Sequence, residues 1–388
     1  MTQISGEVAS GFEAVREAFE RNFTEHGDEG AAFCLYRNGV KVVDLWGGVA
    51  DVPASRPWTE DTLQLVFSTT KGATAICALR LVERGELDLD TPVTDLWPEF
   101  KAEGKEEIPV RWLLTHRSGL PALDGFASKE DVLGWDGICA QLAAQAPFWE
   151  PGSAHGYHAL TYGWLVGEIV KRVSGKSLGT FFRDEVAGPL GLDFFVGLPS
   201  EQQERVSRLE QLTTTGMGDM DIDSLPPEVQ EIARAFTDPE SLTSRALNIT
   251  RPALNWNDPD VRAAEIPAAN GVTTARSLAK LYAACAGEVD GVRVLKPETI
   301  ETATQTQSEG PDKVLFAPTR FGLGFMLNSL FSPMLAEGSF GHAGAGGSLG
   351  FGDPGAGVGF GYVMNKMQQN LAGDPRTLGL IEAVKASL

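Results

Sequence analysis

Positive charge is scarce in this sequence. Lysine and arginine together number 32, against 52 aspartates and glutamates, so the chain of 388 residues has a formal net charge of −20. A surface this acidic repels phosphate backbones and anionic lipids. The charge balance therefore argues against nucleic acid and membrane surfaces as partners.

Cysteine is also scarce, and its copies lie far apart in the chain. None belongs to a C-x-x-C pair; the four are Cys34, Cys77, Cys139 and Cys285. This pattern predicts neither a zinc site nor a disulfide framework. Scattered thiols are typical of small buried side chains in a reducing compartment.

Long apolar runs are missing as well. No uncharged apolar stretch approaches the ~18 residues that suggest a membrane-spanning helix. Residues 1–23 carry several acidic side chains, where a secretory signal has a basic start and a continuous apolar segment. The predicted location is the cytoplasm.

The sequence does contain enough apolar side chains to form more than one hydrophobic core. Apolar residues make up 43% of the chain and charged residues 22%, which is ordinary for a globular protein. Strand-like runs flank Asn38-Gly39, a strong hairpin signal, and further strand patterns return near residues 321–330, 346–351 and 358–364. The pattern predicts an α/β (α+β) fold. Its sheet domain comprises residues 1–87 and 270–388, and a mostly helical domain of residues 88–269 is inserted between them.

Candidate chemistry begins at Ser68, where a strand-like run gives way to a predicted helix over residues 72–84. Arg80 is the only charge within its apolar stretch, so this helix is expected to be buried. If residues 68–71 form its first turn, Ser68 and Lys71 share one face. Apolar burial lowers the pKa of an ammonium, which lets it act as the base that a serine nucleophile needs. Taken alone, the S-x-x-K tetrapeptide is more often an ordinary helix cap followed by a surface lysine; the position of Lys71 at the start of a helix expected to be buried argues against that reading here.

Two further segments carry candidate site residues. A loop around Tyr157 precedes a predicted helix, and its tyrosine is either a packed anchor or a proton shuttle beside the Ser–Lys pair. A glycine-rich strand around His342 and Gly344 is the third segment. Glycines in a strand commonly mark a place where a ligand approaches the backbone.

These segments resemble the three motifs of serine β-lactamases and penicillin-binding proteins, in order and approximate spacing. The motifs are Ser68-Thr69-Thr70-Lys71, Tyr157-His158-Ala159 and His342-Ala343-Gly344. The flanking residues 113–120 are similar to the esterase branch of that superfamily, the family VIII carboxylesterases, and the resemblance extends over about residues 30–367. It implies a β-lactamase-like fold, an antiparallel sheet flanked by helices with an inserted helical domain.

The resemblance also implies a role for each matching residue. Ser68 resembles the acylated nucleophile, Lys71 its base, and Tyr157 the tyrosine that shares the proton with that lysine. The strand with His342 and Gly344 would line the site, and the Ala345 amide would join the Ser68 amide as an oxyanion hole. No cofactor and no metal are implied. The expected partner is a small-molecule ester, with the oligomeric state left open.

Two departures from the family pattern bear on the substrate. His342 replaces a lysine that steadies the substrate carboxylate, and Ala159 replaces an asparagine or serine. Both remove polar groups that β-lactam or peptide substrates use, which favours hydrolysis of short-chain uncharged esters. The alternatives are a β-lactamase or D-Ala-D-Ala peptidase, or a non-catalytic penicillin-sensing module. Aromatic residues of the inserted region are candidates for an acyl pocket or for the core: Trp135, Phe148, Trp149 and Trp164.

Three other patterns do not support competing chemistry. Residues 346–350 spell the nucleophile elbow G-x-S-x-G, but a turn and not a helix follows directly, and no histidine lies beyond Ser348. This serine is therefore expected to be a strand residue near the site. The glycines of residues 350–355 precede no helix, which excludes a dinucleotide fingerprint. His155 and His158 do not indicate a zinc site, because no third histidine or carboxylate lies at helical spacing from them. A long surface loop is predicted over residues 213–227.

Overall fold

The computed structural model describes residues 2–210, 227–368 and 373–388. The loop predicted over residues 213–227 therefore falls almost entirely outside the described residues. Within them, no helix is both long and apolar enough to cross a membrane.

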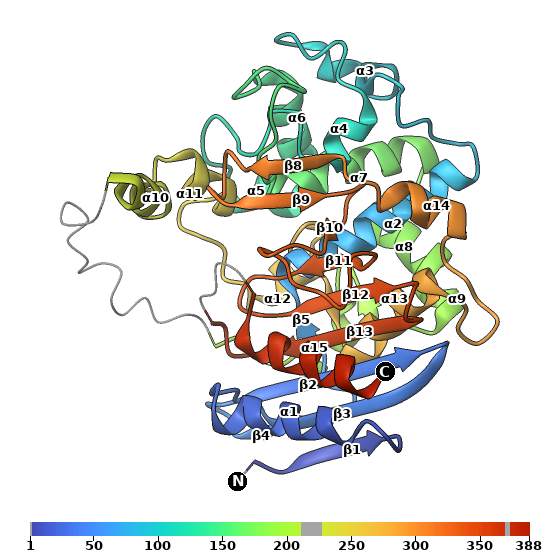
Figure 1. Cartoon of the computed structure of the whole chain (residues 1–388). Coiled ribbons are helices and arrows are strands. Elements are labelled where there is room, and N and C mark those ends of the chain that lie inside the picture. The colour runs from blue at the N-terminus through green and yellow to red at the C-terminus, as the bar shows by residue number, and fades with distance from the viewer. Residues whose placement is uncertain (1, 211–226, 369–372) are drawn as a thin grey trace.

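A large antiparallel sheet joins the two ends of the chain (Figure 1). Over the described residues it has ten strands, in the order β1-β3-β2-β13-β12-β11-β10-β9-β8 with β4 on the side of β3. Their bounds are β1 Ile4–Val8, β2 Gly30–Arg37, β3 Val40–Asp51, β4 Arg56–Pro57, β8 Ser308–Pro311, β9 Pro318–Phe321, β10 Met326–Leu327, β11 Phe340–Ala343, β12 Leu349–Asp353 and β13 Val358–Met364.

The predicted hairpin is present between β2 and β3, and it brings the two ends of the chain together. Asn38 and Gly39 both have the positive φ that a tight two-residue turn requires, 49° and 77°. On its other edge β2 pairs with β13, from Arg37 opposite Val358 to Ala31 opposite Met364. The fold class is as expected, whereas the limits of the two domains stay a prediction.

Helices cover both faces of this sheet. Helices α1 (Glu13–Thr24) and α15 (Pro375–Ser387) pack together on one face, and α13 (Ala275–Ala286) packs on the other against β2, β12 and β13. The glycines of β13 allow this close approach, because a Cβ on Gly361 would lie 2.4 Å from the Ala275 carbonyl oxygen. The helix therefore rests directly on the strand backbone.

The middle of the chain is mostly helical, as expected. Within the described residues, a second sheet of three short strands pairs β5 (Gln64–Leu65) and β6 (Phe194–Phe195) with β7 (Val272–Thr273). The helices are α2 Thr70–Glu83, α3 Val93–Leu96, η2 Pro98–Lys101, α4 Val110–Leu114, α5 Lys129–Gly134, α6 Asp136–Ala144, α7 Thr161–Ser174, α8 Leu178–Phe182, η3 Arg183–Ala187, α9 Gly188–Leu190, η4 Ser200–Arg205, α10 Pro227–Thr237, α11 Leu242–Leu247, α12 Pro259–Ala263 and α14 Pro297–Ala303.

The boundary between strand and helix around Ser68 differs from the prediction. The strand-like run ends after Leu65, and a 3₁₀ turn, η1 (Phe67–Thr69), leads into α2, which begins at Thr70. Helix α2 is buried on nearly every side, as its lack of a polar face predicted. Ser68 consequently sits in a tight turn between a short strand and a buried helix.

Candidate active site

The turn that carries Ser68 is held in an unusual backbone conformation. Phe67 has a φ of 45°, in the left-handed region that residues with a side chain rarely adopt. Its ring packs edge-on against Trp256, with the centroids 5.3 Å apart, and the Thr70 hydroxyl donates to its carbonyl oxygen at 2.5 Å. These contacts hold the turn, and Ser68 is thereby presented to a cavity.

Lys71 lies one helical turn after Ser68, and its ammonium group reaches back to the serine. Its Nζ is 3.1 Å from Ser68 Oγ, 2.7 Å from the Ala159 carbonyl oxygen and 3.0 Å from the Ala268 carbonyl oxygen. The side chain is fully buried, and burial lowers the pKa of the amine well below its ordinary value. Within the described part of the chain no carboxylate forms an ion pair with it.

This arrangement fits a neutral amine. Without its extra proton, a lysine has two N–H groups and one lone pair. Three oxygens surround Nζ, those of Ala159, Ala268 and Ser68. In the neutral amine, which burial favours, the two carbonyl oxygens accept the N–H groups and the lone pair faces Ser68 Oγ. The geometry is that of a base already aimed at the serine hydroxyl.

Tyr157 approaches the same pair from the loop before α7. Its ring centroid lies 4.7 Å from Lys71 Nζ. Burial raises the pKa of its phenol, while a hydrogen bond with the Ser68 side chain lowers it by less. The phenol therefore remains protonated at neutral pH, in contact with both Ser68 and Lys71. A protonated phenol in this place can pass a proton on, rather than act as a standing phenolate base.

Asp312, which no sequence motif indicated, fixes the position of Tyr157. One of its oxygens accepts from the backbone N–H groups of Tyr157 at 3.0 Å, Val314 at 2.8 Å and Leu315 at 2.9 Å. The other accepts from the Thr319 hydroxyl at 3.1 Å. The carboxylate is only 2% exposed. The signal for it in the sequence was weak, an aspartate after a proline in the turn between two strands.

The histidines near Tyr157 have structural partners in the protein. His158 Nδ1 lies 2.7 Å from the Gly156 carbonyl oxygen, and its Nε2 accepts from the Leu120 N–H at 3.1 Å. Burial lowers the pKa of His158 to about 3, so the ring is neutral. His155 Nε2 lies 2.9 Å from the Thr319 hydroxyl. The two rings therefore brace the loop that carries Tyr157.

Of the third motif, Ala343 and Gly344 border the same cavity, whereas His342 is buried behind it and does not line it. A Cβ on Gly344 would lie 2.1 Å from the Val66 carbonyl oxygen and 2.2 Å from Ser348 Oγ, so only glycine permits β11 to approach the Ser68 turn this closely. Ser348 Oγ donates to the Val66 carbonyl oxygen at 2.8 Å. Ser348 thus ties the strand to the turn, in agreement with its expected place beside the site.

The backbone amides of Ser68 and Ala345 have the properties that an oxyanion hole needs. Both residues line the cavity, and neither N–H donates a hydrogen bond to any residue that the structure describes. Two N–H groups that border one cavity can together stabilise a developing oxyanion.

His342 lies on β11 beside these groups and carries no charge at neutral pH. Burial, followed by the nearby Lys71, lowers the pKa of its imidazole to about 3. Its Nδ1 is 2.7 Å from the Ala343 carbonyl oxygen, and its Nε2 has no partner among the described residues. The ring centroid is 6.0 Å from that of Tyr157. His342 therefore supplies no cation to this site.

The cavity beside Ser68 has a volume of about 320 Å³ and a largely apolar wall. Asp374 is its only charged lining residue among those described, and it is paired with Arg376. The apolar wall comes from Phe236, Leu247, Leu315, Met326, Phe331, Pro333 and Met367. The aromatic residues 135, 148, 149 and 164 do not line this cavity, and Trp164 is fully buried in the core.

A methyl group on Gly344 is expected to disturb this site while the fold persists. In Gly344→Ala the new Cβ collides with the Val66 carbonyl oxygen, which must shift the turn carrying Ser68 relative to β11. A displacement of about 1 Å in a catalytic group costs on the order of 10²-fold in rate. Ester turnover measured with p-nitrophenyl butyrate should fall by about that factor.

Gly338→Ala is the matched control, because a Cβ there meets no atom within 4 Å. It should leave turnover unchanged. Full activity in Gly344→Ala would show that the close approach of β11 does not matter for the site.

The fold and this cluster define a class of protein: an α/β protein with a serine, a buried lysine and a tyrosine assembled beside strand β11 of an antiparallel sheet. A protein-family model described as Beta-lactamase matches residues 16–384. The chain belongs to this β-lactamase family.

Named relatives agree with that assignment. The esterase/β-lactamase LipL of Mycobacterium tuberculosis is 35% identical over 354 residues, which cover 89% of this chain and 79% of that protein. A penicillin-binding protein homologue from Caulobacter crescentus is 40% identical with a TM-score of 0.85, and a family VIII carboxylesterase is 39% identical with a TM-score of 0.86. Both of these structures match over 100% of each chain.

Proposed function

We propose that this protein is a serine carboxylesterase that hydrolyses short-chain, uncharged carboxylic esters through an acyl-enzyme on Ser68. The observation that carries the proposal is the buried Lys71 amine, with its N–H groups accepted by two carbonyl oxygens and its remaining position 3.1 Å from Ser68 Oγ. Relatives named esterase/β-lactamase and family VIII carboxylesterase support the same activity. The predicted location remains cytoplasmic, in keeping with four buried free thiols.

Acylation would proceed by attack of Ser68 Oγ on the ester carbonyl carbon. The Oγ proton passes to Lys71 Nζ as the C–O bond forms, and the carbonyl oxygen becomes an oxyanion facing the Ser68 and Ala345 amides. The oxyanion then collapses, and the bond to the alcohol oxygen breaks. The Tyr157 phenol gives its proton to the leaving alkoxide and is reprotonated from Lys71.

Deacylation would use the same groups in a second cycle. Water attacks the acyl carbon and gives one proton to the neutral Lys71 amine, and the second oxyanion forms in the same place. Its collapse releases the carboxylic acid, and Ser68 Oγ recovers a proton from Lys71 through Tyr157. Every proton is returned within the cycle, so these residues need no cofactor for the hydrolysis.

The charge of the cavity favours a neutral substrate. His342 is neutral, and the lining includes no cationic side chain among the described residues. A carboxylate on the substrate would lose its hydration there without gaining an ion pair. β-Lactams and peptides that end in D-Ala-D-Ala carry such a carboxylate, so β-lactamase and peptidase activities are expected to be weak.

Paired substrates test this charge preference. We expect kcat/KM for p-nitrophenyl butyrate to exceed that for mono-p-nitrophenyl succinate by about 10–10²-fold, because the second carries a carboxylate of similar length that finds no partner. Nitrocefin should be turned over more slowly still. Within a p-nitrophenyl ester series, the short acyl groups should be preferred.

The variant His342→Lys offers a matched control, because it places an amine where the β-lactamase pattern has one. It should narrow the gap between the two esters by improving turnover of the succinate. Equal turnover of both esters by the unmodified protein, or preference for nitrocefin, would contradict the charge argument.

A further inference from the structure

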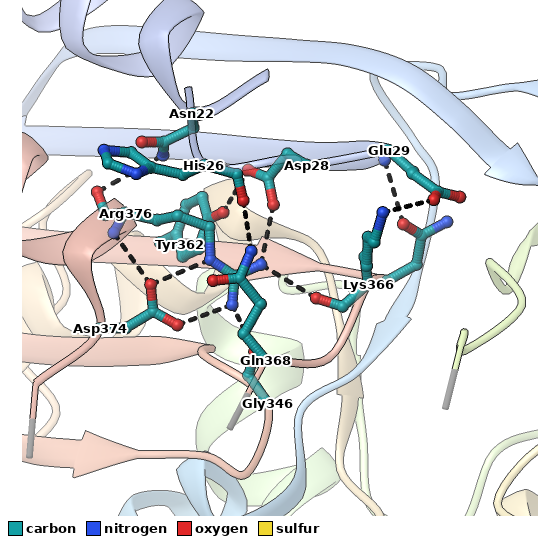
Figure 2. A network of polar contacts seen from close by, with 12 residues as sticks. Asn22, His26, Asp28, Glu29, Gly346, Tyr362, Lys366, Gln368, Asp374 and Arg376 are labelled. Atoms are coloured by element: carbon teal, nitrogen blue, oxygen red, sulfur yellow. Dashed lines mark hydrogen bonds and ion pairs between the residues drawn. The ribbon is translucent and has the colours of Figure 1, made fainter. Parts of the chain in front are cut away.

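A buried cluster of charges contacts the turn after β11 at Gly346, the residue that follows Ala345 (Figure 2). Its centre is Arg376, in the first turn of α15, whose side chain is 0% exposed. Arg376 Nη1 is 2.8 Å from Asp28 Oδ1, and Nη2 is 2.6 Å from Asp374 Oδ2. The Tyr362 phenol donates to the second oxygen of Asp28. The cluster therefore joins the segment after α1 to β13 and the start of α15.

The guanidinium group also holds backbone carbonyl oxygens. Its Nη2 donates to the Gly346 carbonyl oxygen and its Nη1 to the Lys366 carbonyl oxygen, the latter at 2.9 Å. The Gly346 oxygen accepts a further hydrogen bond from the Gln368 N–H at 3.1 Å. Figure 2 shows Gly346 at the end of this network, one residue after Ala345.

The turn 344–348 needs such an anchor because its glycines allow the backbone to adopt many conformations. Gly346 and Gly347 have φ values of 86° and 126°, conformations that glycine adopts freely, together with many others. The base of the turn is tied by Gly344 N–H to the Ser348 carbonyl oxygen at 2.7 Å. Its tip, which follows Ala345, is held by Arg376 and by the segment that Arg376 also holds at Lys366.

We propose that Arg376 is a positioning residue for the oxyanion hole: it fixes the turn 344–348 so that the Ala345 N–H points into the cavity. This inference rests on the proposed function. A Cβ on Gly347 would lie 2.2 Å from Arg376 Nη2, so the guanidinium group and the turn are in direct packing contact as well as hydrogen-bonded.

The shape of the guanidinium group explains why an arginine occupies this place. Its Nε and Nη2 bind both oxygens of Asp374, at 2.9 Å and 2.6 Å, in a planar two-point contact that fixes its orientation. The remaining N–H groups are thereby directed at the Gly346 and Lys366 carbonyl oxygens and at Asp28. A lysine keeps the charge but has no fixed fork, so it cannot meet the carboxylate and the carbonyl oxygens together.

The test compares Arg376→Lys with Tyr362→Phe in the full-length protein, at about pH 8, where Asp28, with a pKa raised by burial to about 6, is ionised. Tyr362→Phe is the control, because it removes a buried hydrogen bond from the same cluster but leaves the contact between Arg376 and Gly346. Each variant is assayed well below its melting temperature. The readouts are kcat and KM for p-nitrophenyl butyrate and the Ki of phenylboronic acid, which forms a tetrahedral adduct on a reactive serine.

We expect Arg376→Lys to lower kcat by about 10–10²-fold with little change in KM, and to raise the boronate Ki by a similar factor, because the loss of one oxyanion donor costs on the order of 10²–10³-fold in kcat. Tyr362→Phe should melt at a lower temperature with unchanged kcat and Ki. If Arg376→Lys only melts earlier and keeps its kcat and Ki, the inference is overturned.

A gentler variant keeps the test decisive if Arg376→Lys does not fold. Asp374→Asn retains the shape of the side chain but weakens the two-point contact that orients Arg376. It should lower kcat and raise the boronate Ki in the same sense, and unchanged values would overturn the inference. Failure of the proposed function is a separate result: the unmodified protein would then neither turn over the ester in a Ser68-dependent way nor bind the boronate.

Discussion

Ser68→Ala is expected to abolish turnover of p-nitrophenyl butyrate, lowering kcat by about 10⁴-fold or more, as the loss of a serine nucleophile does in serine hydrolases. The substitution removes one oxygen that is solvent-facing in the cavity and leaves the surrounding hydrogen bonds of Lys71 to Ala159 and Ala268 intact. The fold should therefore persist. Initial rates and a thermal melt on the same preparation separate loss of chemistry from loss of structure.

Ser348→Ala is the matched control, since both serines line the same cavity. Ser348 Oγ is engaged with the Val66 carbonyl oxygen and the Thr69 hydroxyl, at 2.8 Å and 3.0 Å, and no lysine or histidine among the described residues forms a hydrogen bond with it. Only a mild loss is expected. Complete inactivation by Ser348→Ala, or full activity in Ser68→Ala, would move the nucleophile away from Ser68.

A covalent probe separates an esterase from a binding module that has kept the fold. A fluorophosphonate should add to the unmodified protein and give a mass increase on the peptide that contains Ser68, because the adjacent Lys71 amine activates its hydroxyl. Ser68→Ala should gain no mass. An unmodified protein that stays unlabelled would favour the penicillin-sensing alternative.

The sequence indicated those parts of the site that are formed by residues close together in the chain. Ser68 and Lys71 are one helical turn apart, and Asn38-Gly39 specify a turn that few other pairs allow. Both features follow from local geometry, so they can be predicted without the tertiary structure. The family resemblance supplied what local geometry could not, the meeting of Tyr157 and the His342 strand with that pair.

The supporting residues could not be predicted because their partners are distant in the chain. Asp312 holds Tyr157, which lies 155 residues earlier, and Arg376 binds Asp28 over 348 residues. Neither has a motif; each is defined only by the tertiary packing that buries it. The cavity wall is missed for the same reason: Leu247, Leu315 and Phe331 come from separate segments, whereas Trp164 belongs to the core of α7.

The apolar wall of the cavity also explains why a lysine can act as the base in this site. Lys71 has no ion-pair partner among the described residues, and burial in this largely apolar site is the cause of its lowered pKa. Charge around this amine would change its protonation: an adjacent carboxylate would stabilise the ammonium and remove the lone pair from Ser68. The preference for a neutral substrate and the availability of a neutral lysine therefore have one physical origin, a dry site with little charge.

Lys71→Met is accordingly expected to lower kcat/KM for p-nitrophenyl butyrate by about 10²–10⁴-fold, the range for a positioned acid–base group. Methionine fills a similar volume, so the buried site should not collapse. The carbonyl oxygens of Ala159 and Ala268 lose their donor, which predicts some loss of stability that a thermal melt will register. Assays at a temperature where the variant remains folded isolate the effect on chemistry.

The dependence of kcat/KM on pH tests the role of Lys71 as the base more directly than the rate loss in Lys71→Met does. Activity requires the neutral amine, so kcat/KM should fall as the pH drops through the lowered pKa of Lys71. The titratable groups near it are Tyr157, Tyr162, His116, His158 and His342. Burial raises the pKa of both phenols and lowers the pKa of the three imidazoles, so none of them titrates near neutral pH. This acid limb should vanish in Lys71→Met and persist in Tyr157→Phe, which retains the amine and loses only the relay to the leaving group. An acid limb that survives in Lys71→Met would assign the base to another residue.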